Sequence, residues 1–131
     1  MTSRRRRYRV VIGQTAAREL EESLDDLERY SAGRAGKVLD AIDACAQRLS
    51  RFPESSAVDP SAPAALLKQE AKGRRTHAEG FSIRYAFPVQ IEGNVDVVLI
   101  LSIRHGKRRP LGDREYLRRF LAELVRGQSA R

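Results

Sequence analysis

The sequence contains few of the residues that form disulfides and metal sites. Among 131 residues it has one cysteine, Cys45, two histidines, His77 and His105, and no tryptophan. A single cysteine excludes an internal disulfide and suits a reducing cytoplasm. These three side chains also provide too few ligands for a structural zinc site. We therefore expect no metal and no other cofactor.

Long apolar runs are missing as well. No segment approaches the ~20 apolar residues that cross a membrane, and residues 1–7 form a basic head without the apolar core of a secretory signal. The length and a hydrophobic content of 41% indicate a single folded domain. We expect a cytoplasmic protein without a membrane partner, with a basic disordered arm at 1–7, one domain at 8–127 and a tail at 128–131.

The formal net charge of +8 is unevenly distributed. Residues 1–67 carry 11 basic and 10 acidic side chains, whereas residues 68–131 carry 14 basic and 7 acidic ones. Such a surplus predicts attraction to a polyanion or to an acidic partner segment. A surface of scattered, solvated cations is the alternative.

The first half of the chain has the periodicity of a strand followed by two helices. Tyr8, Val10 and Ile12 alternate with other residues, which predicts a short strand. Apolar residues then recur at helical spacing from Thr15, a candidate N-cap, to about residue 31, and again from Gly36 to Pro53. The short link between them favours an antiparallel hairpin. The polar face of the first helix carries Glu19, Glu22, Asp25, Asp26 and Glu28, and Cys45 falls on the apolar stripe of the second.

The second half reads as three strands and a last helix. Residues 67–76 form a basic strand, placed at an edge, residues 81–87 alternate strictly, and residues 95–103 are almost continuously apolar, as in a central strand covered on both faces. A final amphipathic helix begins near Asp113 and ends near Gly127. The predicted fold class is α+β: an N-terminal strand, an antiparallel helical hairpin, an antiparallel sheet of about four strands and a C-terminal helix. We expect the helices on one side of the sheet.

The order of these pieces resembles the RelE/ParE superfamily of bacterial type II toxins. The matching pieces are residues 8–11, the hairpin at 15–53, Phe-Ser-Ile-Arg-Tyr at 81–85 and Ile-Arg-His-Gly-Lys-Arg at 103–108. The resemblance implies a cognate antitoxin that neutralises the toxin, and growth arrest when the toxin is free. RelE-like members cut messenger RNA on the ribosome, whereas ParE-like members poison DNA gyrase without cleaving RNA. Fold alone does not decide between these activities.

Three residues are candidates for catalysis if the chain is a nuclease. His105 lies where the central strand meets a basic turn, either as a general acid or base or as a cap of the strand end. Arg84 alternates outward from the apolar face of its strand and so faces solvent or a ligand. Tyr85 is either core or a base-stacking ring. The resemblance also implies an arginine three residues before this tyrosine, but Ser82 stands there, which weakens the nuclease reading. His77 is interpreted as ordinary surface.

Two groups of cations are candidates for binding the target. Lys107, Arg108 and Arg109 form the denser group, for which we favour a binding role. The second group either clamps a phosphate backbone or protects an edge strand from aggregation, and consists of Lys68, Lys72, Arg74 and Arg75.

The sequence favours a toxin that poisons gyrase or acts by another non-nucleolytic route. A ribosome-dependent mRNA endoribonuclease is the alternative, so whether the chain is an enzyme stays open. A non-toxic basic module that binds nucleic acid is the second alternative, and a short acidic reading frame beside the gene would speak against it. We expect the partners to be an antitoxin and either DNA gyrase or the ribosome with its mRNA.

Overall fold

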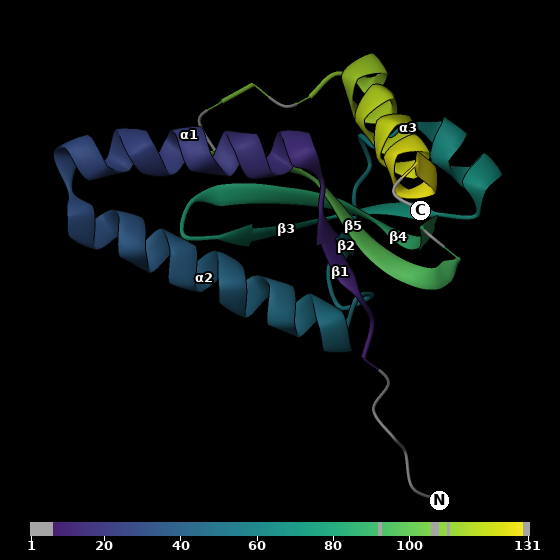
Figure 1. The fold of residues 1–131 in the computed structure, drawn as a ribbon, viewed down its shortest axis with the longest axis horizontal. Helices are drawn as coiled ribbons and strands as arrows, with labels where there is room; N and C mark the ends of the chain where they lie inside the picture. Colours follow the sequence, from purple (N-terminus) through teal and green to yellow (C-terminus); the bar gives the residue numbers. More distant parts are fainter. Residues whose placement is uncertain (1–6, 92, 106–107, 110, 130–131) are drawn as a thin grey trace, which may run out of the picture.

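The computed structural model describes residues 7–91, 93–105, 108–109 and 111–129. The expected basic arm at 1–7 therefore lies outside the described residues except for Arg7, which is exposed. The elements follow in the order β1 (Val10–Ile12), α1 (Gln14–Tyr30), α2 (Ala32–Arg51), β2 (Ala57–Val58), the 3-10 helix η1 (Ala64–Gln69), β3 (Lys72–Ala78), β4 (Phe81–Ile91), β5 (Asn94–His105) and α3 (Asp113–Ser129) (Figure 1).

A five-stranded mixed sheet forms the centre of the fold. Its strand order is β1-β5-β4-β3-β2. β1 runs parallel to β5, and the other neighbouring strands are antiparallel. The sequence predicted an antiparallel sheet of about four strands. The observed sheet has one strand more, and its β1–β5 pair is parallel. The additional strand, β2, has two residues within a proline-containing loop, which is too short to show any alternation.

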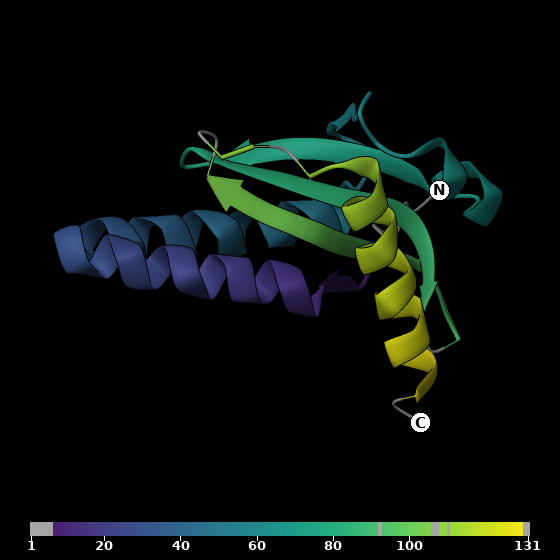
Figure 2. The ribbon, with the colours of Figure 1, turned by 90° about the horizontal axis from the view of Figure 1, so that it is seen from above.

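The helical hairpin is confirmed and covers one face of the sheet. Figure 2 shows α1 and α2 side by side, with α3 running across their direction. The hairpin buries Leu20, Ile42 and Leu49 against Ile83 and Tyr85 of β4. Cys45 is buried in the same cluster, as expected of a small apolar side chain.

The C-terminal helix covers the opposite face, so the expectation that all helices share one side is wrong. Tyr116 and Phe120 of α3 pack with Leu66 of η1 and with Leu99 and Leu101 of β5 in a second core. Residues 97–103 of β5 are all buried. A strand that is apolar on both faces needs a covering layer on each side, and α3 with η1 forms the second layer.

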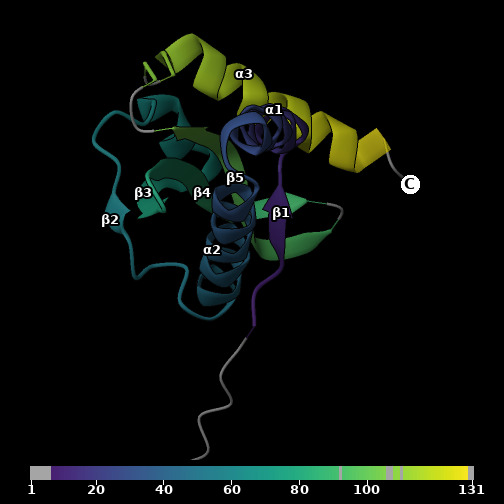
Figure 3. The ribbon, with the colours of Figure 1, turned by 90° about the vertical axis from the view of Figure 1, so that its left-hand side faces the viewer.

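The start of α1 differs from the expected one. The helix begins at Gln14, and the Thr15 side chain does not cap it. Instead, the backbone nitrogen of Gln14 donates a hydrogen bond to Oε2 of Glu123 on α3, at 2.8 Å. The N-terminal end of α1 accordingly lies beside α3 (Figures 1 and 3). A carboxylate at this end satisfies a free amide and complements the helix dipole.

Two other helix boundaries also differ. α2 begins at Ala32 and includes Gly33 and Gly36, so these glycines do not interrupt the helix. α3 continues through Gly127 to Ser129, two residues into the segment expected as a tail.

The basic strand is shorter than expected. Residues 64–69 form η1, so Lys68 lies on a 3-10 helix rather than on a strand. β3 begins at Lys72 and is not the outermost strand, because β2 pairs with it at Arg74 and Arg75. Gly73 allows a close approach at this point, since a β-carbon there would lie 2.3 Å from Cβ of Ala62.

Candidate functional site

Polar and basic side chains from three strands meet at the end of the sheet that contains the β3–β4 turn. His77 of β3 is paired with Ser82 of β4, which in turn is paired with Arg104 of β5. One row further along, Arg75, Arg84 and Ser102 are paired in the same way. Because side chains alternate between the two faces of a strand, both rows project from the face opposite the helical hairpin.

These rows border a cavity of about 320 Å³, which we call the arginine–histidine pocket. None of the described residues that line it is acidic. Arg108 from the segment after β5 and Leu111 before α3 complete its wall. The side chains on which the argument below depends are Arg75, His77, Ser102, Arg104, His105 and Arg108.

Arg84 is not presented to solvent, which corrects the sequence-based expectation. Its side chain is buried, with Nε donating to Oδ2 of Asp59 at 2.6 Å and Nη2 donating to Oγ of Ser61 at 2.9 Å. The guanidinium also lies over the ring of Tyr116, 4.7 Å from its centroid. Alternation along β4 correctly placed Arg84 opposite the apolar residues. That face is covered by α3 and the loop after β2, which the alternation of one strand does not reveal.

The buried carboxyl of Asp59 is held in its charged form. Burial alone raises the pKa of Asp59, but hydrogen bonds from Ser61 and Arg84 outweigh this effect. The pKa of Asp59 is therefore lower than its ordinary value. Asp59 and Arg84 form a compensated charge pair beneath the pocket, and the positive charge of Arg84 is largely neutralised.

Tyr85 is core, with its hydroxyl group engaged. The side chain is fully buried, and Oη donates a hydrogen bond to the carbonyl oxygen of Pro53 at 2.6 Å. Burial raises the pKa of the Tyr85 hydroxyl, and the positive charges of Arg74 and Arg48 oppose the rise only in part. This ring is not exposed for stacking on a base.

His105 is the last residue of β5, as expected for a residue at the strand end. Its ring lies edge-on to Phe81, with centroids 5.5 Å apart and an interplanar angle of 81°. It lines the arginine–histidine pocket and also a second hollow of about 340 Å³ beside α1, where Glu22 and Asp26 are found. The imidazole thus separates a basic hollow from one with acidic residues.

His77 was read as ordinary surface, and the structure places it in the pocket wall beside Arg75. Its side chain is exposed. The signal was present in the sequence, because His77 and Arg75 are two residues apart on one strand and therefore share a face. It was missed because the strand was expected to end at Thr76, whereas β3 extends to Ala78.

The four cations assigned to the basic strand do not form a single clamp. Arg75 lines the arginine–histidine pocket, whereas Lys72 is exposed beside a different hollow, next to β2. Arg74 is committed to structure, since Nη1 donates to the carbonyl oxygens of Ser56 at 2.7 Å and Glu54 at 3.2 Å. Lys68 is on η1 rather than on the strand. The four cations therefore do not act as one group.

The second cation group follows β5. Arg108 and Arg109 are exposed, and Lys107 lies outside the described residues. The carbonyl oxygen of Arg109 accepts a hydrogen bond from Nη1 of Arg104 at 2.9 Å. That contact holds this segment against the end of the sheet, next to the pocket.

Most of the chain matches the model of one known protein family. The family model described as the ParE toxin of the type II toxin–antitoxin system, parDE, matches residues 10–110. The chain belongs to the ParE toxin family. A search of curated proteins finds no match to it. Membership in this family implies an antitoxin partner for the toxin.

The matched region of the toxin runs from the start of β1 to the end of the cation group after β5. It therefore contains the hairpin, the whole sheet and almost all of the pocket wall. α3 lies outside the match and forms the second covering layer. None of the helices within the described ranges has the length and apolar character that crossing a membrane requires.

Proposed function

We propose that this toxin arrests growth by poisoning DNA gyrase, or by another route that does not cleave RNA, and that an antitoxin holds it in check in the cytoplasm. The observation that carries the proposal is the burial of Arg84 at 4% exposure, with its Nε on Asp59. An arginine that stabilises the phosphate of a cleavage transition state must reach that phosphate. Here Arg84, the arginine of β4, is buried and neutralised by a carboxylate instead.

Tyr85 supports the same proposal. Its fully buried hydroxyl group is hydrogen-bonded to Pro53 and does not face the pocket side of the sheet. Two of the three nuclease candidates are therefore structural in this conformation. The exposed Arg108 and Arg109, by contrast, offer charge to a protein target without any requirement for catalytic geometry.

One observation favours the nuclease alternative. His77 and His105 line the same basic pocket, and two imidazoles beside arginines are suited to moving the protons of a 2′-hydroxyl attack. A test of the proposal must therefore examine both activities with the same preparation.

Purified toxin is added to a gyrase supercoiling reaction and, separately, to a cell-free translation reaction in which messenger RNA ends are mapped. The proposal expects loss of supercoiling, with intact message in the presence and absence of the toxin. New mRNA ends that require translating ribosomes and disappear in a His105→Ala variant would replace it with the nuclease alternative. In that case a His77→Ala variant tests whether the second imidazole takes part.

A further inference from the structure

The floor of the arginine–histidine pocket carries a polar group that has no partner. Ser102 is 1% exposed, lines the pocket, and its Oγ makes no hydrogen bond among the residues that the structure describes. A buried hydroxyl group without a partner is costly, so native proteins seldom keep one without a reason. The hydroxyl group is placed where a ligand in the pocket would supply the missing bond.

The wall of the pocket carries positive charge that is not neutralised within the fold. Arg84 is paired with Asp59 at 2.6 Å, and Arg104 with Glu19 at 3.2 Å. Within the described part of the chain, no carboxylate lies within 4.0 Å of Arg75 or Arg108. The surplus charge of the pocket therefore comes from these two arginines, one on each side of it.

The arrangement of the donors favours a tetrahedral anion. Arg75 comes from β3, Ser102 and Arg104 from β5, and Arg108 from the segment after it, so more than two donor groups, drawn from three parts of the chain, border the same cavity. Arginine binds phosphate oxygens with two parallel hydrogen bonds, and a hydroxyl group can donate to a further oxygen. A carboxylate has only two oxygens, which lie in one plane with its carbon.

We propose that the arginine–histidine pocket binds a phosphate group. Its volume of about 320 Å³ is at the small end of ligand pockets and suits a phosphate with one attached nucleoside. The group can belong to a free nucleotide or to a nucleic acid, since the chemistry recognised is the same. The inference goes beyond the proposed function, because it concerns the isolated toxin and needs neither gyrase nor the ribosome.

Calorimetric titration of the purified toxin at constant ionic strength tests the proposal with four probes. These are inorganic phosphate, adenosine 5′-monophosphate, adenosine without phosphate, and a short RNA with 2′-O-methyl groups that resists cleavage. We expect binding of the monophosphate and no binding of adenosine. Tighter binding of the monophosphate than of the RNA would identify a free nucleotide as the source, and the reverse order a nucleic acid.

Three variants assign the binding to the pocket. We expect Arg75→Gln to weaken binding of the monophosphate about tenfold, through loss of a charge-assisted bond, and Ser102→Ala to weaken it roughly fivefold. Because Oγ of Ser102 has no partner, Ser102→Ala should melt at the same temperature or higher. Arg51→Gln is the matched control, since it removes the same charge from an exposed position at the end of α2. It should bind like the unchanged toxin.

Three results would overturn the proposal. One is the absence of binding for all three phosphate-bearing probes. Another is binding that Arg75→Gln and Arg51→Gln weaken equally, because it would then reflect overall charge. The third is binding that Ser102→Ala leaves unchanged, because the ligand would then not reach the floor of the pocket. A toxin that fails to poison gyrase but binds the monophosphate leaves this inference standing, so the two proposals fail separately.

Discussion

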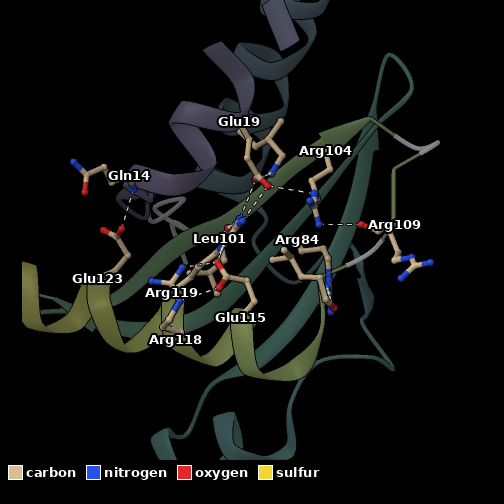
Figure 4. Close-up of polar contacts among 12 residues, drawn as sticks. Gln14, Glu19, Arg84, Leu101, Arg104, Arg109, Glu115, Arg118, Arg119 and Glu123 are labelled. Atoms are coloured by element: carbon tan, nitrogen blue, oxygen red, sulfur yellow. Dashed lines mark hydrogen bonds and ion pairs between the residues drawn. The ribbon is translucent and has the colours of Figure 1, made fainter. Parts of the chain in front are cut away.

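Glu19 and Arg119 lie a hundred residues apart in the sequence and form a two-pronged ion pair. Nη1 of Arg119 is 2.9 Å from Oε1 of Glu19, and Nη2 is 3.1 Å from Oε2 (Figure 4). Both side chains also bond to the backbone of β5 just past Ile100, the last residue that pairs with β1. Arg119 donates to the carbonyl oxygen of Leu101 at 3.0 Å, and Glu19 accepts from the amide of Ile103 at 3.2 Å. The pair joins α1, β5 and α3.

Loss of one partner of this pair should destabilise the fold strongly. Both residues are buried, and Glu19→Gln removes the carboxylate that pairs with Arg119 and Arg104, leaving Arg119 only its pair with Glu115, so the change should lower the free energy of unfolding by about 2 kcal/mol. Urea unfolding followed by circular dichroism measures the change. Glu21→Gln is the matched control, since Glu21 is exposed on the same helix, and it should change the free energy by less than about 0.5 kcal/mol.

A double variant separates the pair from other effects. If the ion pair accounts for the loss, Glu19→Gln combined with Arg119→Gln should cost clearly less than the sum of the two single changes. Additive costs would mean that each residue acts through its other partners, which are the β5 backbone together with Arg104 for Glu19 and Glu115 for Arg119, rather than through the ion pair between them.

Asp59 should make stability depend on pH in the acid range. Its pKa in the folded toxin lies below the ordinary value of 3.8, because hydrogen bonds from Ser61 and Arg84 outweigh burial. Its contribution is therefore fully present above pH 3.8 and is lost as the pH falls through the folded pKa. Asp59→Asn should be less stable at pH 7 by about 3 kcal/mol, because Arg84 is left buried without its counter-charge.

Urea titrations from pH 7 to about pH 3 measure this dependence. The difference in free energy between the unchanged toxin and Asp59→Asn should shrink as the pH falls. Asp43→Asn provides the control at an exposed carboxyl of α2. A difference that stays constant down to pH 3 would contradict the assignment of the charged form to Asp59.

Gly73 should not tolerate a side chain. A β-carbon there would lie 2.3 Å from Cβ of Ala62 and 3.0 Å from Oη of Tyr116. Overpacking of this kind costs about 1–3 kcal/mol, so Gly73→Ala should lower the melting temperature. Gly36→Ala serves as the comparison: nothing lies within 4 Å of its new β-carbon, and the helix should gain about 0.5–1 kcal/mol. Equal melting temperatures for the two variants would mean that the loop before η1 does not pack on β3 as described.

The long periodic elements could be predicted from the sequence, and the reason is visible in the hairpin and in β5. Their apolar patterns extend over many residues, so each pattern identifies both the element and its buried face. β2 could not be predicted in this way, because a strand of two residues is too short to show a repeating pattern of apolar and polar side chains. The ParE-like resemblance also depended on these long elements, and the family match over residues 10–110 agrees with it.

The polar interior of the toxin was the part that the sequence did not reveal. Glu19 was placed on the polar face of α1, and it is buried because α3 returns to cover it a hundred residues later. Arg84 was assigned to the correct face of β4, yet that face is covered by Tyr116 and Asp59. Local alternation gives the direction of a side chain, whereas its burial depends on elements far away in the chain.

The cation group after β5 should be necessary for growth arrest. Replacement of Lys107, Arg108 and Arg109 with alanine removes three positive charges from the part of the sequence that follows β5. Arg108 and Arg109 are exposed, so the change should leave the fold intact. We expect cells that express this variant without antitoxin to grow, with the level and melting temperature of the protein unchanged. A variant with alanine at Arg34, Lys37 and Arg51, all exposed on α2, has the same net charge and should still arrest growth. Arrest by both variants at equal protein levels would remove the group from the mechanism, and arrest by neither would assign the effect to overall charge.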